Sequence, residues 1–219
     1  MIKLYGHPFS RAHRVMWMLK ELDLPFEHIE TDFRSGATRT DEFRAINPNG
    51  RVPVLVDGAL TLFESLAINL YLARQYPSAV SPRTVAEEAQ AVQWSFWTVT
   101  EVEKPLLFAA ANLFLFPDHE RSEQAAGIGI KKLDRPFRVL DAHLAKRSYV
   151  LGDRFSVADV NIAGPMTLIP ISGVPLGAYP ALSDWLSRCL ERPAAADWKP
   201  IRFTIPRPPT SDKMLEMFL

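Results

Sequence analysis

The chain has 219 residues, of which 47% are hydrophobic and 23% charged, and its 25 Lys and Arg residues balance 25 Asp and Glu residues. A net charge of zero does not favour nucleic acid as a partner and suits a small, apolar substrate. The single cysteine, Cys189, excludes an internal disulfide or a multi-cysteine metal site, so we expect no metal and a reduced, cytoplasmic setting. The most apolar run, residues 105–116, is too short to span a membrane, and Met1 is not followed by a signal-peptide pattern.

The first eighty residues alternate between strand and helix patterns. Apolar residues at period 2 or at helical spacing predict strands at 2–5 and 26–31, helices at 11–22, 41–46 and 65–75, and a hairpin of 54–56 with 60–63 around Asp57-Gly58. This order predicts an α/β domain with a mixed sheet over residues 1–77. A proline- and serine-containing stretch at 78–84 breaks the pattern and predicts a linker.

Strand patterns largely disappear after the linker, which predicts an all-helical domain at 85–219. Long helical patterns cover 85–116, where Pro105 could kink or divide the helix, and 119–146, with a bend expected near Gly127 or Pro136. Ser156 and Asp159 have the spacing of a capping box and predict the start of a third helix, and a fourth covers 180–190. The proline-rich tail from Trp198 gives no clear pattern.

The most informative segment is Asn47-Pro-Asn-Gly-Arg-Val-Pro-Val-Leu, which is followed by Glu64-Ser65. Pro53 heads an apolar strand, which predicts a bend at a sheet edge and a position where a cis bond costs little. Such a bend leaves the backbone groups of Val52 free, and the helix that starts at Glu64-Ser65 attracts an anion. These features predict a cradle for a small peptide-like carboxylate, although a structural turn beside a serine N-cap explains the spacing equally well.

The chain resembles the cytosolic glutathione transferases over nearly its whole length, to about Pro193. The resemblance combines the motif at 47–55, Phe63-Glu-Ser, the Ser156 capping box, and Tyr179-Pro-x-Leu-x-x-Trp with its following Arg-Pro. It implies a thioredoxin-like first domain that binds glutathione as co-substrate. It also implies a helical bundle that supplies much of the pocket for a small hydrophobic electrophile, and assembly into a homodimer.

Carried over by position, the resemblance assigns the glutathione contacts. Val52 would pair its backbone with the cysteinyl part, just before a cis Pro53. Glu64 and Ser65 would hold the γ-glutamyl end, with its carboxylate at the start of the helix. Arg51 could face the glycyl carboxylate, and a solvated arginine in a turn is the alternative.

The reacting group is expected at Ser10, because Ser10-Arg-Ala-His-Arg14-Val resembles the serine-type motif of the theta and phi classes. A hydroxyl that donates to sulfur lowers a thiol pKa, and a shift of about 2 units corresponds to roughly 2.7 kcal/mol. A plain helix N-cap is the alternative role for this serine. Tyr5 lies too early in the chain, and the nearby histidines and arginines (His7, His13, Arg11 and Arg14) suit orientation or the surface better than chemistry.

Phe9, Trp97 and Phe108 are candidates for the electrophile pocket, although such an aromatic stripe also suits a core. The predicted reaction is attack of the glutathione thiolate, by conjugation or halide displacement. Thiol–disulfide exchange would need a cysteine near Ser10, where this chain has none. The maleylacetoacetate isomerase group of the family has a pattern similar to Ser-Ser-Cys in this loop, where this chain has Pro8-Phe-Ser. A different glutathione-dependent isomerase and a non-catalytic glutathione-binding module stay open as alternatives.

Overall fold

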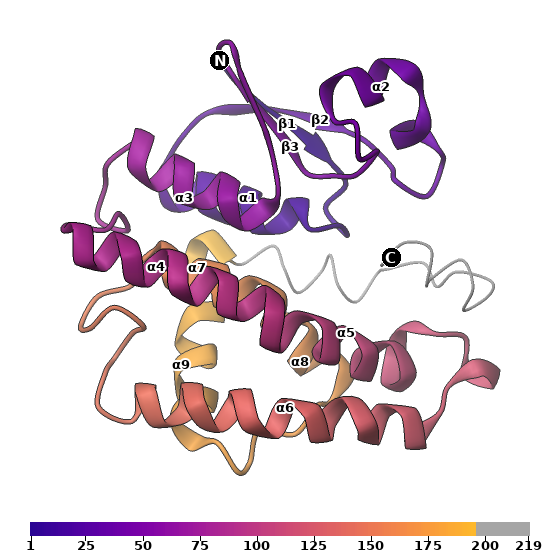
Figure 1. The fold of residues 1–219 in the computed structure, drawn as a ribbon, viewed down its shortest axis with the longest axis vertical. Coiled ribbons are helices and arrows are strands. Elements are labelled where there is room, and N and C mark those ends of the chain that lie inside the picture. Colours follow the sequence, from indigo (N-terminus) through magenta and orange to yellow (C-terminus); the bar gives the residue numbers. More distant parts are fainter. Residues whose placement is uncertain (196–219) are drawn as a thin grey trace.

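A computed structural model describes residues 1–195 of the chain. It consists of a sheet covered on one side by two helices, above a helical bundle (Figure 1). The predicted fold class, a thioredoxin-like α/β domain with a mixed sheet followed by a helical bundle, is confirmed. Residues 196–219, which include the end of the predicted helical domain, lie outside the described part.

The first domain is built around a four-stranded sheet in the order β2-β1-β3-β4. β1 runs parallel to β2 and antiparallel to β3, so the sheet is mixed as predicted. Its elements are β1 (Ile2–Gly6), α1 (Ala12–Glu21), β2 (Phe26–Glu30), η1 (Ala37–Arg39), α2 (Asp41–Ile46), β3 (Val54–Asp57), β4 (Leu60–Phe63) and α3 (Ser65–Gln75).

The expected place of Pro53 at a sheet edge is wrong. β3 pairs with β1 on one side and with β4 on the other, so it is an interior strand. Ladder pairing begins at Val54, and the missing N–H of Pro53 therefore falls just outside the ladder, where it costs no strand hydrogen bond. The expected cis bond is present between Val52 and Pro53.

The predicted hairpin is also present, with its loop one residue later than expected. Asp57 pairs with Leu60, which leaves Gly58 and Ala59 as a two-residue loop. Gly58 has a φ of 61° and Ala59 a negative one, the pattern of a type II′ turn. Asp57 belongs to β3 rather than to the loop, and its side chain accepts hydrogen bonds from the hydroxyls of Tyr71 at 2.9 Å and Tyr76 at 2.6 Å. These bonds connect the hairpin to α3 and to the residue that ends α3.

The second domain is helical throughout the described residues. Its elements are α4 (Val85–Trp97), η2 (Thr98–Glu103), α5 (Lys104–Ala110), η3 (Ala111–Leu115), η4 (Asp118–Glu120), α6 (Glu123–Leu144), α7 (Val157–Met166), α8 (Leu168–Ser172), α9 (Pro180–Leu190) and η5 (Pro193–Ala195). No helix among residues 1–195 is both long enough and apolar enough to cross a membrane.

The stretch predicted as one helix from residue 85 is divided by two π-helical segments, η2 and η3. Pro105 has no N–H to offer the carbonyl of Glu101, and a wider turn immediately before it accommodates the lost bond. By contrast, α6 continues through both Gly127 and Pro136. It begins at Glu123, four residues after the predicted start, because the Ser122 hydroxyl caps the amide of Ala125 at 3.1 Å.

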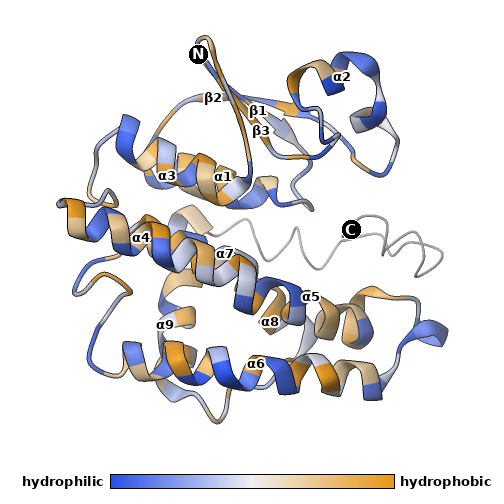
Figure 2. Cartoon of the chain, in the orientation of Figure 1, coloured by the Kyte–Doolittle hydropathy of each residue, from blue (hydrophilic) through white to orange (hydrophobic). Residues whose placement is uncertain are grey.

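α7 is the central element of the molecule. All ten of its residues are buried, and it packs against α4 and α9 of its own domain and against α1 and α3 of the first domain. The predicted capping box closes at its start: Asp159 accepts hydrogen bonds from the backbone N–H and the hydroxyl of Ser156, both at 2.8 Å. In Figure 2, apolar residues likewise line the helix faces that meet within the bundle.

Candidate functional site

The loop between β1 and α1 carries Ser10. It leaves the sheet at Gly6, whose φ is 156°, and a Cβ added there would lie only 2.5 Å from the Cβ of Ala12. The same position lies 3.6 Å from both the Ser10 Oγ and the Val52 Cβ. The Ser10 hydroxyl therefore sits beside the entry to the cis-proline strand, although the two residues are 42 positions apart in the chain.

The Ser10 hydroxyl is already part of a local hydrogen-bond pattern. It donates to the His7 carbonyl at 2.7 Å and accepts from the Ala12 amide at 3.1 Å. This places Ser10 one residue before the helix N-cap, which is Arg11 and has no side-chain cap bond of its own. Ser10 thus contributes to the start of α1, and its oxygen lies at the helix N-terminus, where negative charge is favoured.

Two histidines shape this loop. The Nδ1 atom of His7 accepts from the Phe9 amide at 3.1 Å, so the ring proton is on Nε2, which faces Glu30 at 3.7 Å. Burial, helped by Arg34, lowers the pKa of His7. His13 is buried, with its ring nitrogens 2.6 Å from the Ser10 carbonyl and 3.2 Å from the Gly164 carbonyl of α7. The surface alternative for His13 is therefore wrong, and its orienting role stays a prediction.

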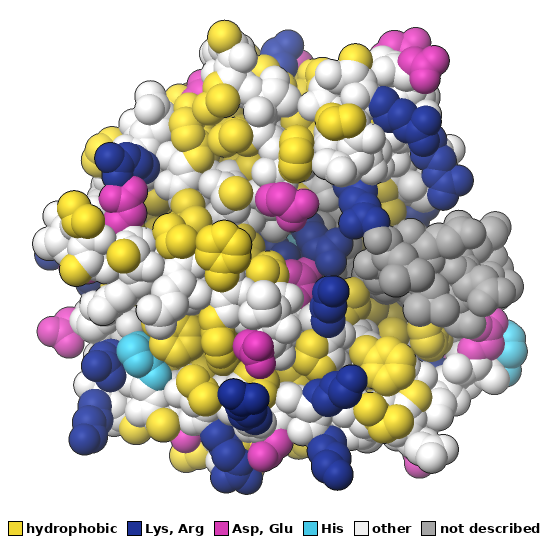
Figure 3. Space-filling model, viewed as in Figure 1, with side chains coloured by type: hydrophobic (Ala, Val, Ile, Leu, Met, Phe, Trp, Pro, Cys, Tyr) yellow, Lys and Arg dark blue, Asp and Glu magenta, His cyan; other side chains and the backbone are white. Residues whose placement is uncertain are grey.

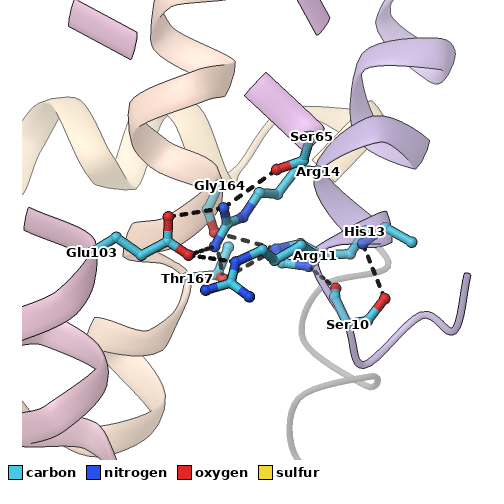
Figure 4. Close-up of polar contacts among 9 residues, drawn as sticks. Ser10, Arg11, His13, Arg14, Ser65, Glu103, Gly164 and Thr167 are labelled. Carbon is cyan, nitrogen blue, oxygen red and sulfur yellow. Dashed lines mark hydrogen bonds and ion pairs between the residues drawn. The ribbon is translucent and has the colours of Figure 1, made fainter. Parts of the chain in front are cut away.

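A charged cluster joins α1 to the helical domain (Figure 4). Arg14 donates to both oxygens of Glu103, at 2.9 and 3.2 Å, and Arg11 donates to Glu103 Oε1 at 2.7 Å. Arg14 is only 4% exposed, so the surface alternative is wrong for this residue too. On the face drawn in Figure 3, basic and acidic side chains gather in the hollow between the two domains.

The electrostatics of the cluster follow from its burial. Burial would by itself raise the pKa of Glu103, but attraction to Arg14 and Arg11 outweighs it and lowers that pKa to about 2. Burial also lowers the pKa of Arg14, against the opposing effect of Glu103. At neutral pH Glu103 is therefore ionised, and its carboxylate faces the guanidinium groups of Arg14 and Arg11.

Ser65 begins α3 on the other side of Arg14. Glu64, just before it, has a φ of 70°, so Glu64 is the N-cap and Ser65 is the first helical residue. The serine N-cap alternative is therefore wrong. The Ser65 hydroxyl is buried and accepts a hydrogen bond from Arg14 Nη1 at 3.4 Å, which links the start of α3 to α1.

The loop before the cis proline is held by Asn47. Its side-chain amide donates to the Arg51 carbonyl at 2.6 Å, and its Oδ1 accepts from the Asn49 amide at 3.1 Å. Gly50 has a φ of 61°, and a Cβ there would meet the Thr38 carbonyl at 3.0 Å. These contacts fix the backbone of Arg51 and Val52, while the Arg51 side chain extends to an exposed position.

The three aromatic candidates lie in different surroundings. Phe9 is beside Ser10, packs against His7 and is covered by Arg34. Trp97 packs edge-on against Trp94, inside the helical domain, and Phe108 is 42% exposed on α5. Their role toward an electrophile stays a prediction.

Sequence reasoning missed the contribution of the helical domain to this site. Three residues of this domain contact side chains of α1. Glu103, at the end of η2, accepts from Arg14. The Gly164 carbonyl of α7 and the hydroxyl of Thr167, just after α7, lie beside the His13 ring. The sequence gives no signal for Glu103, because the burial of Val102 and Leu106 near it is evident only in the folded protein. The motif at 47–55 includes Asn47, but nothing in its sequence indicates that this side chain anchors the loop.

Comparison with known proteins agrees with this geometry. The N-terminal domain model of glutathione S-transferases matches residues 1–74, and the C-terminal domain model matches residues 104–193. Fold and site therefore define a two-domain protein of the glutathione S-transferase type. The chain belongs to the glutathione S-transferase family.

Individual relatives cover nearly the whole chain. Glutathione S-transferase GstB of Escherichia coli K12 is 35% identical over 89% of this chain and 95% of its own length. Glutathione S-transferase 3 of Zea mays is also 35% identical, over 88% of this chain and 90% of its own. A theta-class glutathione S-transferase from Xanthomonas axonopodis pv. citri, solved with glutathione bound, superposes with a TM-score of 0.83 at 29% identity, covering 93% of this chain and 98% of that one.

Proposed function

We propose that this protein is a glutathione transferase that activates the glutathione thiol with Ser10, for attack on a small apolar electrophile by conjugation or halide displacement. The observation that carries the proposal is that the Ser10 hydroxyl lies close to the entry of the cis-proline strand. The Ser10 Oγ and the Val52 Cβ are each 3.6 Å from the position that a Cβ on Gly6 would occupy. A thiol held by the backbone of Val52 would therefore lie within reach of that hydroxyl. Family membership supports the same activity.

The glutathione roles divide along the molecule. The Val52 backbone, ahead of Pro53, pairs with the cysteinyl part. At the γ-glutamyl end, the N-terminus of α3 with Ser65 binds the carboxylate, and Glu64 faces the ammonium group. Arg51 serves the glycyl carboxylate from its exposed position.

Ser10 acts as a hydrogen-bond donor, and glutathione itself supplies the nucleophile. In the free protein the hydroxyl donates to the His7 carbonyl, so it rotates to donate to the bound sulfur. A thiol with a pKa of ~8.5 is only about 3% ionised at neutral pH, and lowering that pKa by about 2 units raises the thiolate fraction some twentyfold. Cys189 does not compete for this role, because it is fully buried and burial raises the pKa of its thiol.

The second substrate and the assembly follow from the same proposal. A small hydrophobic electrophile would approach the sulfur from the side of Phe9, with Trp97 and Phe108 as further candidates. Assembly into a homodimer is supported by exposed apolar side chains on both domains, among them Phe63 of β4 and Phe96 of α4. A cytoplasmic location is consistent with one buried cysteine.

Replacement of Ser10 by alanine tests the catalytic role. We expect Ser10→Ala to retain binding to immobilised glutathione, to raise the pKa of the bound thiol by about 1–2 units, and to lower kcat with an aryl halide by about 10- to 100-fold at neutral pH. The thiolate absorbance of the complex and the pH profile of kcat measure both effects.

Ser35→Ala is the matched control. The Ser35 hydroxyl donates to the Asp32 carbonyl at 2.8 Å and accepts from the Ala37 amide at 3.3 Å, the same local pattern as at Ser10, but on an exposed loop. Full activity and an unshifted thiol pKa in Ser10→Ala would assign the activation to another group. Retention on glutathione without turnover in the wild type would make the protein a binding module.

A further inference from the structure

We propose that Glu103, from the helical domain, is a positioning residue for glutathione binding in the first domain, and that it acts through Arg14. This inference rests on the proposed function, because it concerns the γ-glutamyl end of the same glutathione site. According to this inference, η2 of the helical domain takes part in glutathione binding, because the first domain alone does not hold Arg14 in place.

The geometry fixes Arg14 from two sides. Glu103 accepts from both Nη atoms of Arg14, and this bidentate pairing sets the plane of the guanidinium group as well as its position. On the opposite side Arg14 lies against Gly164, where a Cβ would be only 3.0 Å from the Arg14 Cγ. The helical domain therefore supplies both the partner and the space for this arginine.

The hydrogen-bonding capacity of Arg14 is not used up in the free protein. Its bond to the Ser65 hydroxyl is long, at 3.4 Å, and its buried Nε has no hydrogen-bond partner among the described residues. A buried guanidinium with unused capacity is costly unless something else compensates for it. A carboxylate bound at the start of α3 beside Ser65 would provide that compensation.

The alternative is a purely structural ion pair. A buried pair of this kind is often no more stabilising than apolar residues of the same size, so stability alone is a weak reason for it. Arg11 adds a second guanidinium to the same carboxylate, and two cations in contact would repel each other without Glu103. Glu103 therefore holds together an arrangement that would otherwise move away from Ser65.

Glu103→Gln separates positioning from simple electrostatics, because the two predict opposite signs. The substitution removes one negative charge near a ligand with net negative charge, so electrostatics alone predicts tighter glutathione binding. Positioning predicts weaker binding, since a neutral amide cannot orient Arg14 and Arg11 together. We expect the Kd and KM for glutathione to rise about tenfold, with kcat at saturating glutathione changing less than threefold.

Glu88→Gln is the matched control. Glu88 of α4 also forms an ion pair across the domain boundary, with Arg74 of α3, but at an exposed position. We expect its glutathione Kd to equal that of the wild type, as measured by isothermal titration with glutathione at a fixed ionic strength.

Gly164→Ala provides a second route to the same residue without changing any charge. The added methyl group displaces the aliphatic part of Arg14, so we expect the glutathione Kd to rise in this variant as well. If Glu103→Gln does not fold, as judged by loss of the near-ultraviolet circular dichroism of the folded protein, the glutathione Kd of Gly164→Ala decides the test instead.

Two results are kept apart by this design. Unchanged or tighter glutathione binding by folded Glu103→Gln, or unchanged binding by Gly164→Ala where that variant decides, would overturn the positioning role and leave the proposed function standing. Failure of the wild type to bind glutathione in the same titration would overturn the proposed function itself.

Discussion

Two largely buried carboxylates, Glu103 and Glu21, form ion pairs that cross from one domain to the other. Glu103 pairs with Arg14 and Arg11, and Glu21 of α1 pairs with Arg192, whose guanidinium lies 3.9 Å over the Phe155 ring. Removing one partner from such a pair leaves a buried charge unsatisfied, which is strongly destabilising. These side chains therefore couple domain docking to charge state.

The depressed pKa of Glu103 predicts how this coupling responds to acid. In the unfolded chain the carboxyl titrates near 4.5, and in the folded protein near 2, so its stabilising contribution is fully present above pH 4.5 and is lost as pH falls toward 2. We expect wild type to lose about 1 kcal/mol per pH unit relative to Glu103→Gln between pH 4.5 and 3. Urea unfolding of both proteins at pH 6, 4.5, 4 and 3.5 measures the difference, and a constant difference would contradict the assignment.

At the scale of the elements, α5 and α6 approach each other closely at Gly129. A Cβ there would lie 2.9 Å from the Cβ and the amide nitrogen of Ala109 and from the Pro105 carbonyl. Backbone atoms cannot move aside as a flexible side chain does, so the contact requires glycine in α6. The break in the preceding helix at Pro105 lies at this same contact.

Two glycines of α6 provide a test with opposite signs. We expect Gly129→Ala to lower the free energy of unfolding by about 1–3 kcal/mol, because the methyl group forces the two helices apart. A Cβ on Gly127 would have no other atom within 4 Å, so we expect Gly127→Ala to raise the free energy of unfolding by about 0.5–1 kcal/mol through its higher helix propensity. Denaturant unfolding monitored by far-ultraviolet circular dichroism measures both, and equal effects would exclude the close contact.

At the scale of the whole molecule, α7 joins the two domains through a buried amide network. Asn161 accepts from the Asn69 side chain at 2.9 Å and donates to the Leu66 carbonyl at 3.1 Å, both in α3, and to the Ser95 hydroxyl at 2.8 Å, in α4. Asn69 in turn donates to the Arg14 carbonyl at 3.3 Å. One side chain thus connects three helices and leads back to the candidate site.

We expect Asn161→Ala to destabilise the protein by about 2–4 kcal/mol, because it leaves buried polar groups of both domains without partners. Asn112→Ala is the control: Asn112 is also buried, but its amide bonds the Phe108 carbonyl within one helical segment, and a loss of about 1 kcal/mol is expected. Thermal unfolding followed by circular dichroism and by tryptophan fluorescence measures both. Similar losses in the two variants would show that the network does not join the domains energetically.

Local chemistry determined most of the elements from the sequence. The bounds of α2, α3 and α9 were predicted to the residue, and those of α1 to within one, because apolar spacing and flanking prolines act over only a few positions. The capping box of Ser156 with Asp159 was predicted for the same reason, whereas the cis bond before Pro53 was implied by the family resemblance. The family resemblance, carried by short motifs in order, supplied the two-domain architecture.

The tertiary structure decided the features that depend on distant partners. Glu103 lies 89 positions from Arg14, and nothing in the local pattern of either residue indicates a buried ion pair. Likewise, the interior position of β3 depends on which strands pair beside it, and the depressed pKa of Glu103 depends on two arginines from another domain. Burial and charge pairing arise only when the domains dock, so the sequence predicted the segments at Pro53 and Ser65, and the tertiary structure decided which distant residues support them.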